Sequence, residues 1–199
     1  MRSTMKALAG LCLLLLTSAC IVETEATLGD PDTKAVDARL VGSWYAGKGG
    51  EVVIISAVAD EMKPGAQRAV FVNVNPFPDG DVEGTRYSVW RTVVNGQGYL
   101  NVRRTAGNVA DTPKVTVMAY DIGGDGSLVL RLMDPKKVIA AIEAGKLKGR
   151  FKKGQYVDEA TITATREELT AFIASSNRDE LFSMKTGALR KLADTPADK

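Results

Sequence analysis

The chain contains no histidine, and its only two cysteines, Cys12 and Cys20, lie among the first twenty residues. The rest of the sequence therefore has no imidazole, no thiol and no disulfide. This excludes Ser-His-Asp triads, Cys-His nucleophiles and zinc sites built from histidine or cysteine. Carboxylates, lysines, serines and tyrosines remain for chemistry, and none is spaced in a recognisable catalytic pattern. We therefore expect no enzyme activity, no catalytic residue, no cofactor and no metal site.

An excess of one charge is also lacking. The 199 residues include 26 Lys and Arg against 24 Asp and Glu, and two of the basic residues, Arg2 and Lys6, lie at the extreme N-terminus. Domains that bind nucleic acid usually carry a net basic surface. Nucleic acid is therefore not expected as a partner.

The N-terminus has the features of a secretory signal peptide, which we place at residues 1–19. Positive charges at Arg2 and Lys6 precede the apolar segment Leu8–Leu16, and small residues follow it. This order is typical of a cleaved signal. The apolar segment has about half the ~20 residues that a membrane-spanning helix needs, so we do not expect a permanent transmembrane anchor.

The end of this signal, Thr17-Ser18-Ala19-Cys20, resembles the lipobox of bacterial lipoproteins. The family's usual branched residue three places before the cysteine is here Thr17. The resemblance implies that Cys20 receives a diacylglycerol, becomes the mature N-terminus and anchors the protein in the cell envelope. Lipoproteins with aspartate after the cysteine tend to stay in the inner membrane, so Ile21 implies the outer membrane, facing the periplasm. The alternative is a simple cleaved signal with a stray thiol nearby.

Residues 20–38 are acidic and turn-rich, and they lack apolar periodicity. We interpret them as a flexible tether, which could reach roughly 60 Å when fully extended. The alternative is a first strand packed on the domain. Residues 39–192 are then long enough for one core, and residues 193–199 form a disordered tail.

From residue 40 onward the pattern is mainly β. About eight segments carry apolar alternation or continuous apolar runs bounded by turn residues. They are 40–45, 51–58, 68–75, 86–94, 99–104, 114–120, 127–132 and 158–164. The sequence Asn95-Gly96-Gln97-Gly98 between two of them is a strong hairpin signal, because Asn and Gly tolerate the positive φ of tight turns. Short connections favour an antiparallel, roughly eight-stranded barrel.

Two helices interrupt this pattern. Asp134 and Pro135 form an N-cap followed by proline at the first helical position, and Gly145 ends that helix. It therefore precedes the last expected strand. Thr165 and Glu168 form a capping box that starts a C-terminal helix, and a further amphipathic piece follows.

The sequence Gly42-Ser43-Trp44, on the first expected strand, resembles the Gly-x-Trp signature of lipocalins and their calycin relatives. The resemblance implies an eight-stranded barrel in which Trp44 plugs one end and an arginine from a late strand packs across it. Two features depart from the family: its Thr-Asp-x-Tyr motif is not evident, and a helix precedes the last strand.

The central hairpin predicts which side chains point into the barrel. With a loop of two or four residues, its more apolar face holds Tyr87, Val89, Val93, Leu100 and Val102, together with Arg91 and Arg104. A buried arginine needs a partner. In a functional interpretation Arg91 or Arg104 meets the anionic group of a bound amphiphile. In a structural interpretation an arginine covers Trp44 or pairs with an internal acid. On the other face, we expect Trp90 and Arg103 to stack at the surface.

One cluster of basic residues is present, at Lys146, Lys148, Arg150, Lys152 and Lys153. It is either a surface for anionic headgroups near the anchor or a solvated face of a strand with Leu147 and Phe151 turned inward.

These observations favour a lipid-anchored, non-enzymatic binding module for a small apolar or amphiphilic ligand, with Trp44, Arg91 and Arg104 as candidate ligand-binding residues. The alternative is a structural or interaction lipoprotein with a filled barrel that contacts an envelope protein or the cell wall. The sequence identifies neither the ligand nor a protein partner.

Overall fold

The apolar alternation of the sequence produces a mainly β protein, as predicted. The computed structural model describes residues 22–31, 37–46, 51–60, 63–74, 82–105, 114–154 and 158–192. The predicted signal peptide, Cys20 and the predicted C-terminal tail lie outside these residues. The strands are β1 (Val22–Thr24), β2 (Gly42–Tyr45), β3 (Glu51–Asp60), β4 (Lys63–Val74), β5 (Val82–Val94), β6 (Gln97–Arg104), β7 (Thr116–Ile122), β8 (Leu128–Leu132), β9 (Gly149–Lys152), β10 (Glu159–Ile162), β11 (Met184–Lys185) and β12 (Arg190–Lys191). The helices are η3 (Ala38–Leu40, 3-10), α1 (Pro135–Glu143), α2 (Arg166–Ser175) and α3 (Arg178–Leu181).

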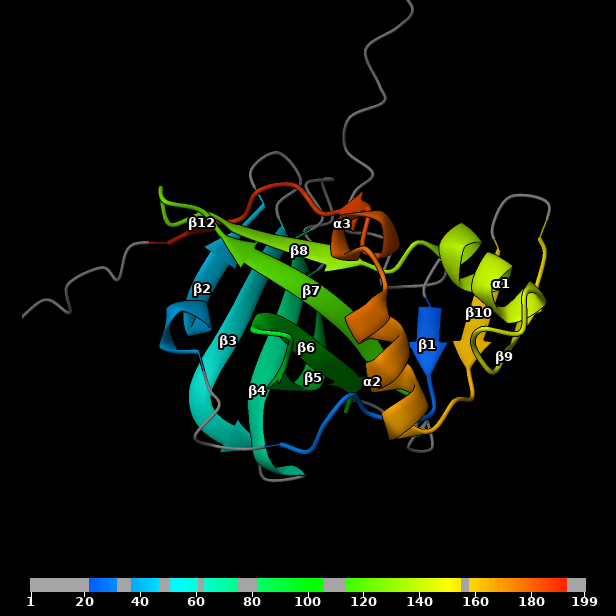
Figure 1. The fold of residues 1–199 in the computed structure, drawn as a ribbon. Coiled ribbons are helices and arrows are strands. Elements are labelled where there is room, and N and C mark those ends of the chain that lie inside the picture. Colours follow the sequence, from blue (N-terminus) through cyan, green and yellow to red (C-terminus); the bar gives the residue numbers. More distant parts are fainter. Residues whose placement is uncertain are drawn as a thin grey trace, which may run out of the picture.

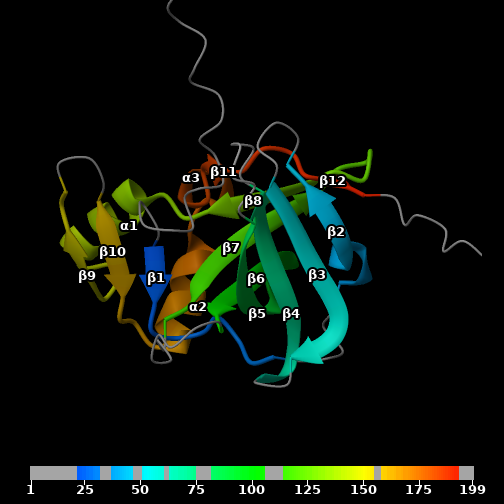
Figure 2. The ribbon, with the colours of Figure 1, turned by 180° about the vertical axis from the view of Figure 1, so that it is seen from behind.

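The larger of two sheets is antiparallel and curls on itself as a half-barrel (Figures 1 and 2). Its strand order is β11-β8-β7-β6-β5-β4-β3-β2-β12. Each of the eight expected segments contains a strand, but β10 pairs in a second sheet, so the expected barrel of about eight strands is not what forms. The short strands β1 and β9 were considered only as alternatives. Strands β11 and β12 were not expected, because segments of two residues carry too little periodicity to detect.

The predicted hairpin forms between β5 and β6, and its loop has two residues, one of the two lengths that the sequence allowed. Asn95 and Gly96 have φ of 50° and 75°, and Val94 lies opposite Gln97. Both positive values match a tight turn whose twist suits the flanking strands. This loop fixes the register of the strands that carry Arg91 and Arg104.

One C-terminal segment connects the two edges of the curled sheet. Its first part, β11, pairs with β8, and Leu189 forms a further bridge to Leu128 of β8. Directly afterwards, β12 pairs with β2. Residues 184–191 therefore give a partner to both edge strands.

The smaller sheet has the order β1-β10-β9 and packs beside α1 (Figure 1). The predicted caps are confirmed: Asp134 accepts a hydrogen bond from the Lys136 amide, Pro135 opens α1, and Thr165 and Glu168 form the capping box of α2. The order of helices differs from the prediction of one helix before the last strand. Two strands follow α1 before α2 and α3, and β11 and β12 come after those helices.

The prediction of a flexible tether over residues 20–38 is wrong for residues 22–31. β1 pairs in parallel with β10, and Leu28 is 3% exposed in the core. The Leu28 amide donates to Asn101 Oδ1 at 2.8 Å, and Trp90 Nε1 donates to the Gly29 carbonyl at 2.7 Å. The N-terminal segment therefore covers Trp90. The Arg103 guanidinium lies 6.0 Å from the Trp90 ring, so the two residues are neighbours as predicted. Trp90 is buried, however, and not at the surface as the prediction had it.

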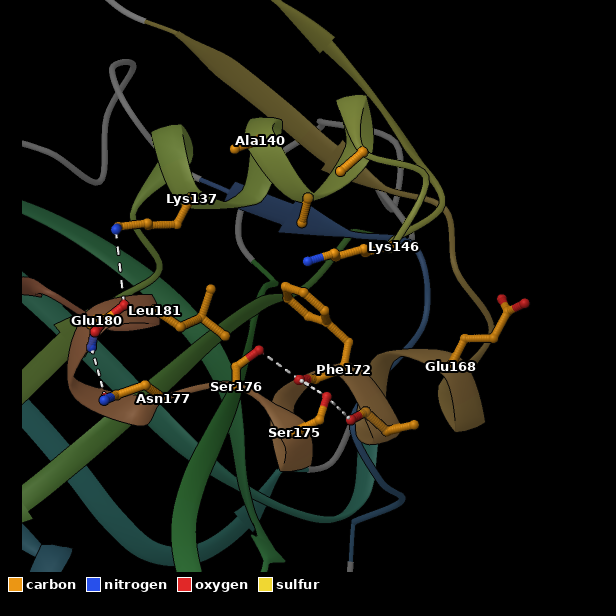
Figure 3. Close-up of a pocket in the computed structure, with 13 residues that line it drawn as sticks. Lys137, Ala140, Lys146, Glu168, Phe172, Ser175, Ser176, Asn177, Glu180 and Leu181 are labelled. Carbon is orange, nitrogen blue, oxygen red and sulfur yellow. Dashed lines mark hydrogen bonds and ion pairs between the residues drawn. The ribbon is translucent and has the colours of Figure 1, made fainter.

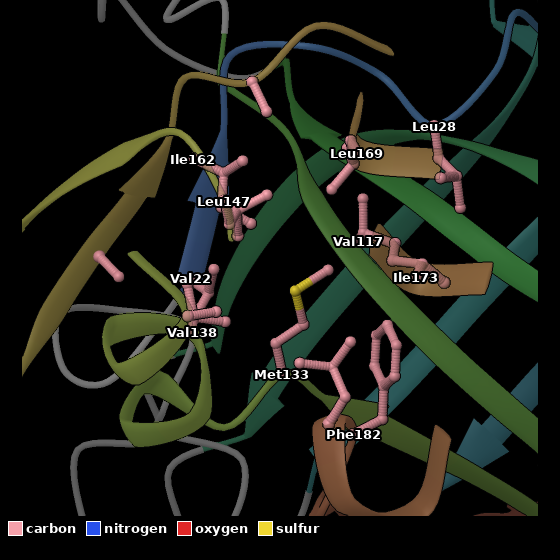
Figure 4. Packing of buried hydrophobic residues seen from close by; sticks show 14 of the residues in the cluster. Val22, Leu28, Val117, Met133, Val138, Leu147, Ile162, Leu169, Ile173 and Phe182 are labelled. Atoms are coloured by element: carbon pink, nitrogen blue, oxygen red, sulfur yellow. The ribbon is translucent and has the colours of Figure 1, made fainter. Parts of the chain in front are cut away.

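Two hydrophobic clusters occupy opposite faces of the large sheet. Leu100, Met118 and Tyr120 point into its concave side. Their strand neighbours Tyr99 and Val117 point outward to a second cluster shared with α1, α2 and the small sheet, where Val22, Val138, Ile162 and Leu169 meet (Figure 4). This second cluster joins the small sheet to the large one.

Candidate functional site

The Trp44 side chain makes a hydrogen bond to the backbone and lies beneath a cation. The indole is 1% exposed, and its Nε1 donates to the Leu40 carbonyl at 2.8 Å. The ammonium of Lys191, from β12, lies 5.6 Å from the ring centroid. The lipocalin resemblance implies an arginine in this role, whereas here a lysine of the C-terminal segment covers the tryptophan.

Gly42 makes this arrangement sterically feasible. Its φ is +136°, a value that side-chain-bearing residues rarely adopt. A Cβ built on Gly42 would collide with the Lys191 stem. Gly42 therefore leaves open the path along which Lys191 reaches Trp44.

Arg91 is engaged by a neighbouring tyrosine. Its Nε donates to the Tyr120 hydroxyl at 2.9 Å, and that hydroxyl donates to Asp37 Oδ2 at 3.0 Å. Asp37 also pairs with Arg39 at 2.6 Å. The Arg39 guanidinium, helped by Tyr120, lowers the pKa of Asp37 to about 2, and burial raises the pKa of Tyr120. Arg91 is thus linked to Asp37 through the Tyr120 hydroxyl.

Arg104 lies in a different environment. It is exposed at the end of β6, opposite Tyr87. Val93, predicted to point inward, is 46% exposed, because it lies at the turn end of the hairpin beside Gly98. Trp44, Arg91 and Arg104 therefore have different principal neighbours, and their role in ligand binding stays a prediction.

The concave side of the large sheet is filled by side chains. Tyr87, Val89, Leu100 and Val102 lie there as predicted. The cluster is completed by Leu40, Trp44, Val53, Ile55, Ala69, Met118, Tyr120, Leu128, Leu130, Leu132 and Leu189. All fifteen are 8% exposed or less, so the described interior is a packed core.

Most members of the basic cluster have acidic partners. Lys148 pairs with Glu168 at 2.6 Å, Arg150 with Glu25 at 2.7 Å and Lys153 with Glu143 at 2.8 Å. Leu147 is buried, as predicted. Phe151 is 37% exposed and lies under Lys153, so the prediction that it turns inward is wrong. It lies on the edge strand β9, which has a neighbour on one side only.

A groove of about 770 Å³ lies between α1 and the helices α2 and α3 (Figure 3). The apolar part of its wall consists of Ala140, Ala141, Ala144, Ala171, Phe172 and Leu181. Lys137 and Glu180 face each other across one end at 4.0 Å. Elsewhere in the groove the Lys146 side chain points toward that of Phe172 (Figure 3). Among the described residues, Lys146 is in none of the ion pairs.

Sequence reasoning missed this groove. Small residues on the exposed side of α1 mark its wall, but their meaning depends on where α2 packs. That position comes from the tertiary fold and not from local sequence.

Two features are absent from the described residues. No group of three or more acidic, histidine or cysteine side chains in these ranges is placed to hold a metal ion. None of the helices in the described part of the chain has the length and apolar character needed to cross a membrane.

Comparisons of the chain with models of protein families, with curated proteins and with solved structures find no match.

Proposed function

We propose that this chain is a lipid-anchored bacterial envelope protein that acts by binding a small amphiphile. The signal peptide, the small residues before Cys20 and the nature of Ile21 support acylation and an outer-membrane position facing the periplasm. Two or three acyl chains, each methylene contributing about 0.8 kcal/mol, anchor a protein durably.

The observation that carries the binding function is the groove between α1 and α2. Its volume of about 770 Å³ suits a small molecule. The alanines and Phe172 offer apolar contact. Lys146 offers a cation at the rim, and Lys137, which faces Glu180, lies at one end of the groove. A ligand with an apolar body and a carboxylate or phosphate group matches both the apolar wall and the cationic rim of the groove. Because the concave side of the large sheet is filled, we place the ligand in this groove rather than beside Trp44, Arg91 and Arg104.

We also propose that the curled sheet shares its architecture with the lipocalins. Gly42 and Trp44 occupy the first strand of the curled sheet, and Lys191 supplies the cation over the tryptophan. This arrangement supports a shared architecture, with the interior used for packing.

A second candidate function is an interaction lipoprotein that contacts an envelope protein or the cell wall. The filled concave side favours it, since small barrels with packed interiors bind at their surfaces. In that case the groove accepts a segment of the partner.

The anchor is tested by fractionation of cells that express the full chain. Cys20→Ala is expected to move the protein from the membrane to the soluble fraction. A variant that stays with the membrane would contradict the lipobox interpretation.

The ligand is tested by native mass spectrometry and lipid extraction of the protein purified from bacterial membranes. A co-purifying fatty acid or phospholipid near one per chain supports the amphiphile, and Ala140→Trp, which fills the groove, should remove it. Lys136→Trp is the matched control, because Lys136 is exposed on the same helix outside the groove. If the amount of co-purifying ligand is the same in Ala140→Trp as in the wild type, the binding site lies outside this groove. The absence of any ligand favours the interaction lipoprotein, which cross-linking in whole cells then tests.

A further inference from the structure

The start of β1 is fixed to the domain only two residues after the predicted acylation site. Val22 is 5% exposed and lies in the cluster shared by α1 and both sheets. It is opposite Ala160 of β10 in parallel pairing, and the chain remains attached through Thr24 and Leu28. The N-terminal end of the described chain is therefore a fixed point on the surface of the domain.

Covalent geometry limits how far this point can lie from the anchor. Two residues span at most about 7 Å. The polar headgroup layer of a bilayer is itself about 5–8 Å thick on each side. An acylated Cys20 at that layer keeps Val22 within reach of the headgroups, whatever conformation the intervening residue adopts.

The same end of the small sheet carries exposed groups suited to a headgroup layer. Val22, Ala160 and Phe151 lie side by side across the three strands. Phe151 is 37% exposed at the sheet edge. The next two residues, Lys152 and Lys153, are exposed cations, of which Lys153 also pairs with Glu143. Exposed aromatic and lysine side chains are favoured at membrane interfaces.

We infer that the domain rests directly on the bilayer through this end of the small sheet, with Phe151, Lys152 and Lys153 against phospholipid headgroups. The inference rests on the proposed lipid anchor. It replaces the long tether expected from the sequence, because residues 22–31 belong to the folded domain. The protein then acts at the membrane surface and does not reach across the periplasm.

The opposite end of the small sheet provides a matched reference position. β1 and β10 run in the same direction, and α2 begins shortly after β10 ends (Figure 1). Asp30, which follows β1, pairs with Arg166 in the first turn of α2 at 2.7 Å. Glu167, exposed in that turn, therefore lies away from the start of β1.

The contact is tested with nitroxide labels on the full, acylated protein. In the mature chain Cys12 is removed with the signal and Cys20 is acylated, so Lys152→Cys and Glu167→Cys each introduce a single free thiol. The proteins are reconstituted into vesicles of phosphatidylethanolamine and phosphatidylglycerol that contain a nickel-chelating headgroup lipid. We expect a several-fold larger relaxation enhancement at residue 152 than at residue 167.

An insertion tests whether the short connection to Cys20 is what keeps residue 152 close to the membrane. Six Gly and Ser residues placed between Ile21 and Val22 add up to about 20 Å of reach. This insertion should lower the enhancement at residue 152 toward the value at residue 167. Equal enhancements at the two positions in an acylated protein overturn the contact and leave the anchor intact. A mature N-terminus without acyl chains overturns the anchor and the contact together.

Discussion

The ammonium of Lys191 lies 5.6 Å from the centroid of the Trp44 ring, and the stem of the lysine passes over Gly42. This contact joins the last strand of the large sheet to the first one along the chain. It also explains why a glycine stands two residues before the tryptophan. Lys191, which is distant in sequence, therefore forms one structural unit with Gly42 and Trp44.

Gly42→Ala is expected to destabilise the protein by about 1–3 kcal/mol, because the added methyl strains a positive φ and displaces Lys191. Urea denaturation measures the change in the free energy of unfolding. Gly124→Ala is the control, since a Cβ there meets no atom within 4 Å. Equal stability of the two variants would show that the Lys191 path is not constrained.

Trp44→Ala is expected to cost about 3–5 kcal/mol, because it opens a cavity in the packed core and removes the bond to Leu40. Tyr45→Ala, on the same strand but 36% exposed, should cost far less. Thermal unfolding followed by circular dichroism compares the two. A loss under about 1 kcal/mol for Trp44→Ala would mean that the indole is not a core element and that the lipocalin resemblance is accidental.

Asn101→Ala is expected to release the N-terminal segment. Asn101 is fully buried, and its side chain accepts from the Leu28 amide and donates to Thr92 Oγ1. Its removal leaves the buried Leu28 amide without its acceptor, at a cost of about 1–3 kcal/mol. Hydrogen exchange should show faster exchange at the Leu28 amide while β5 and β6 remain protected. Unchanged protection at Leu28 would contradict the assigned role.

Asp37 is expected to make stability depend on acid pH. Its pKa in the folded protein is about 2, below the ordinary value of 3.8. The stabilisation is therefore fully present above about pH 5 and is lost as the pH falls toward 2. We expect ionised Asp37 to contribute about 1 kcal/mol to the free energy of unfolding, because Arg39 is largely exposed and solvent weakens the ion pair.

Asp37→Asn removes this pH dependence, and denaturation series between pH 2 and pH 6 measure it. The stability gap between the wild type and Asp37→Asn should narrow as the pH falls. A constant gap across this range would show that the charge of Asp37 contributes nothing.

Local signals account for the parts of the fold that were predicted. The Asn95-Gly96 turn, the Asp134 cap and the Thr165 capping box depend on neighbouring residues only, and each forms as expected. Alternation likewise placed Tyr87, Val89, Leu100 and Val102 on the concave face.

The features that were missed depend on distant partners. Residues 22–31 are polar and turn-rich, yet Asn101 and Trp90 provide hydrogen bonds that hold them on the domain. Phe151 is exposed because β9 is an edge strand, which its sequence does not reveal. The groove exists only because α2 packs beside α1, and the same tertiary arrangement decides its composition.

The segment that pairs with both β8 and β2 comes after the other strands of the large sheet along the chain. Until it arrives, two edge strands expose unpaired amides and carbonyls, which invite pairing with other chains. The large sheet is therefore completed only when this segment has paired with both edges. Removal of these few residues in one cut therefore deprives both edge strands of their partner.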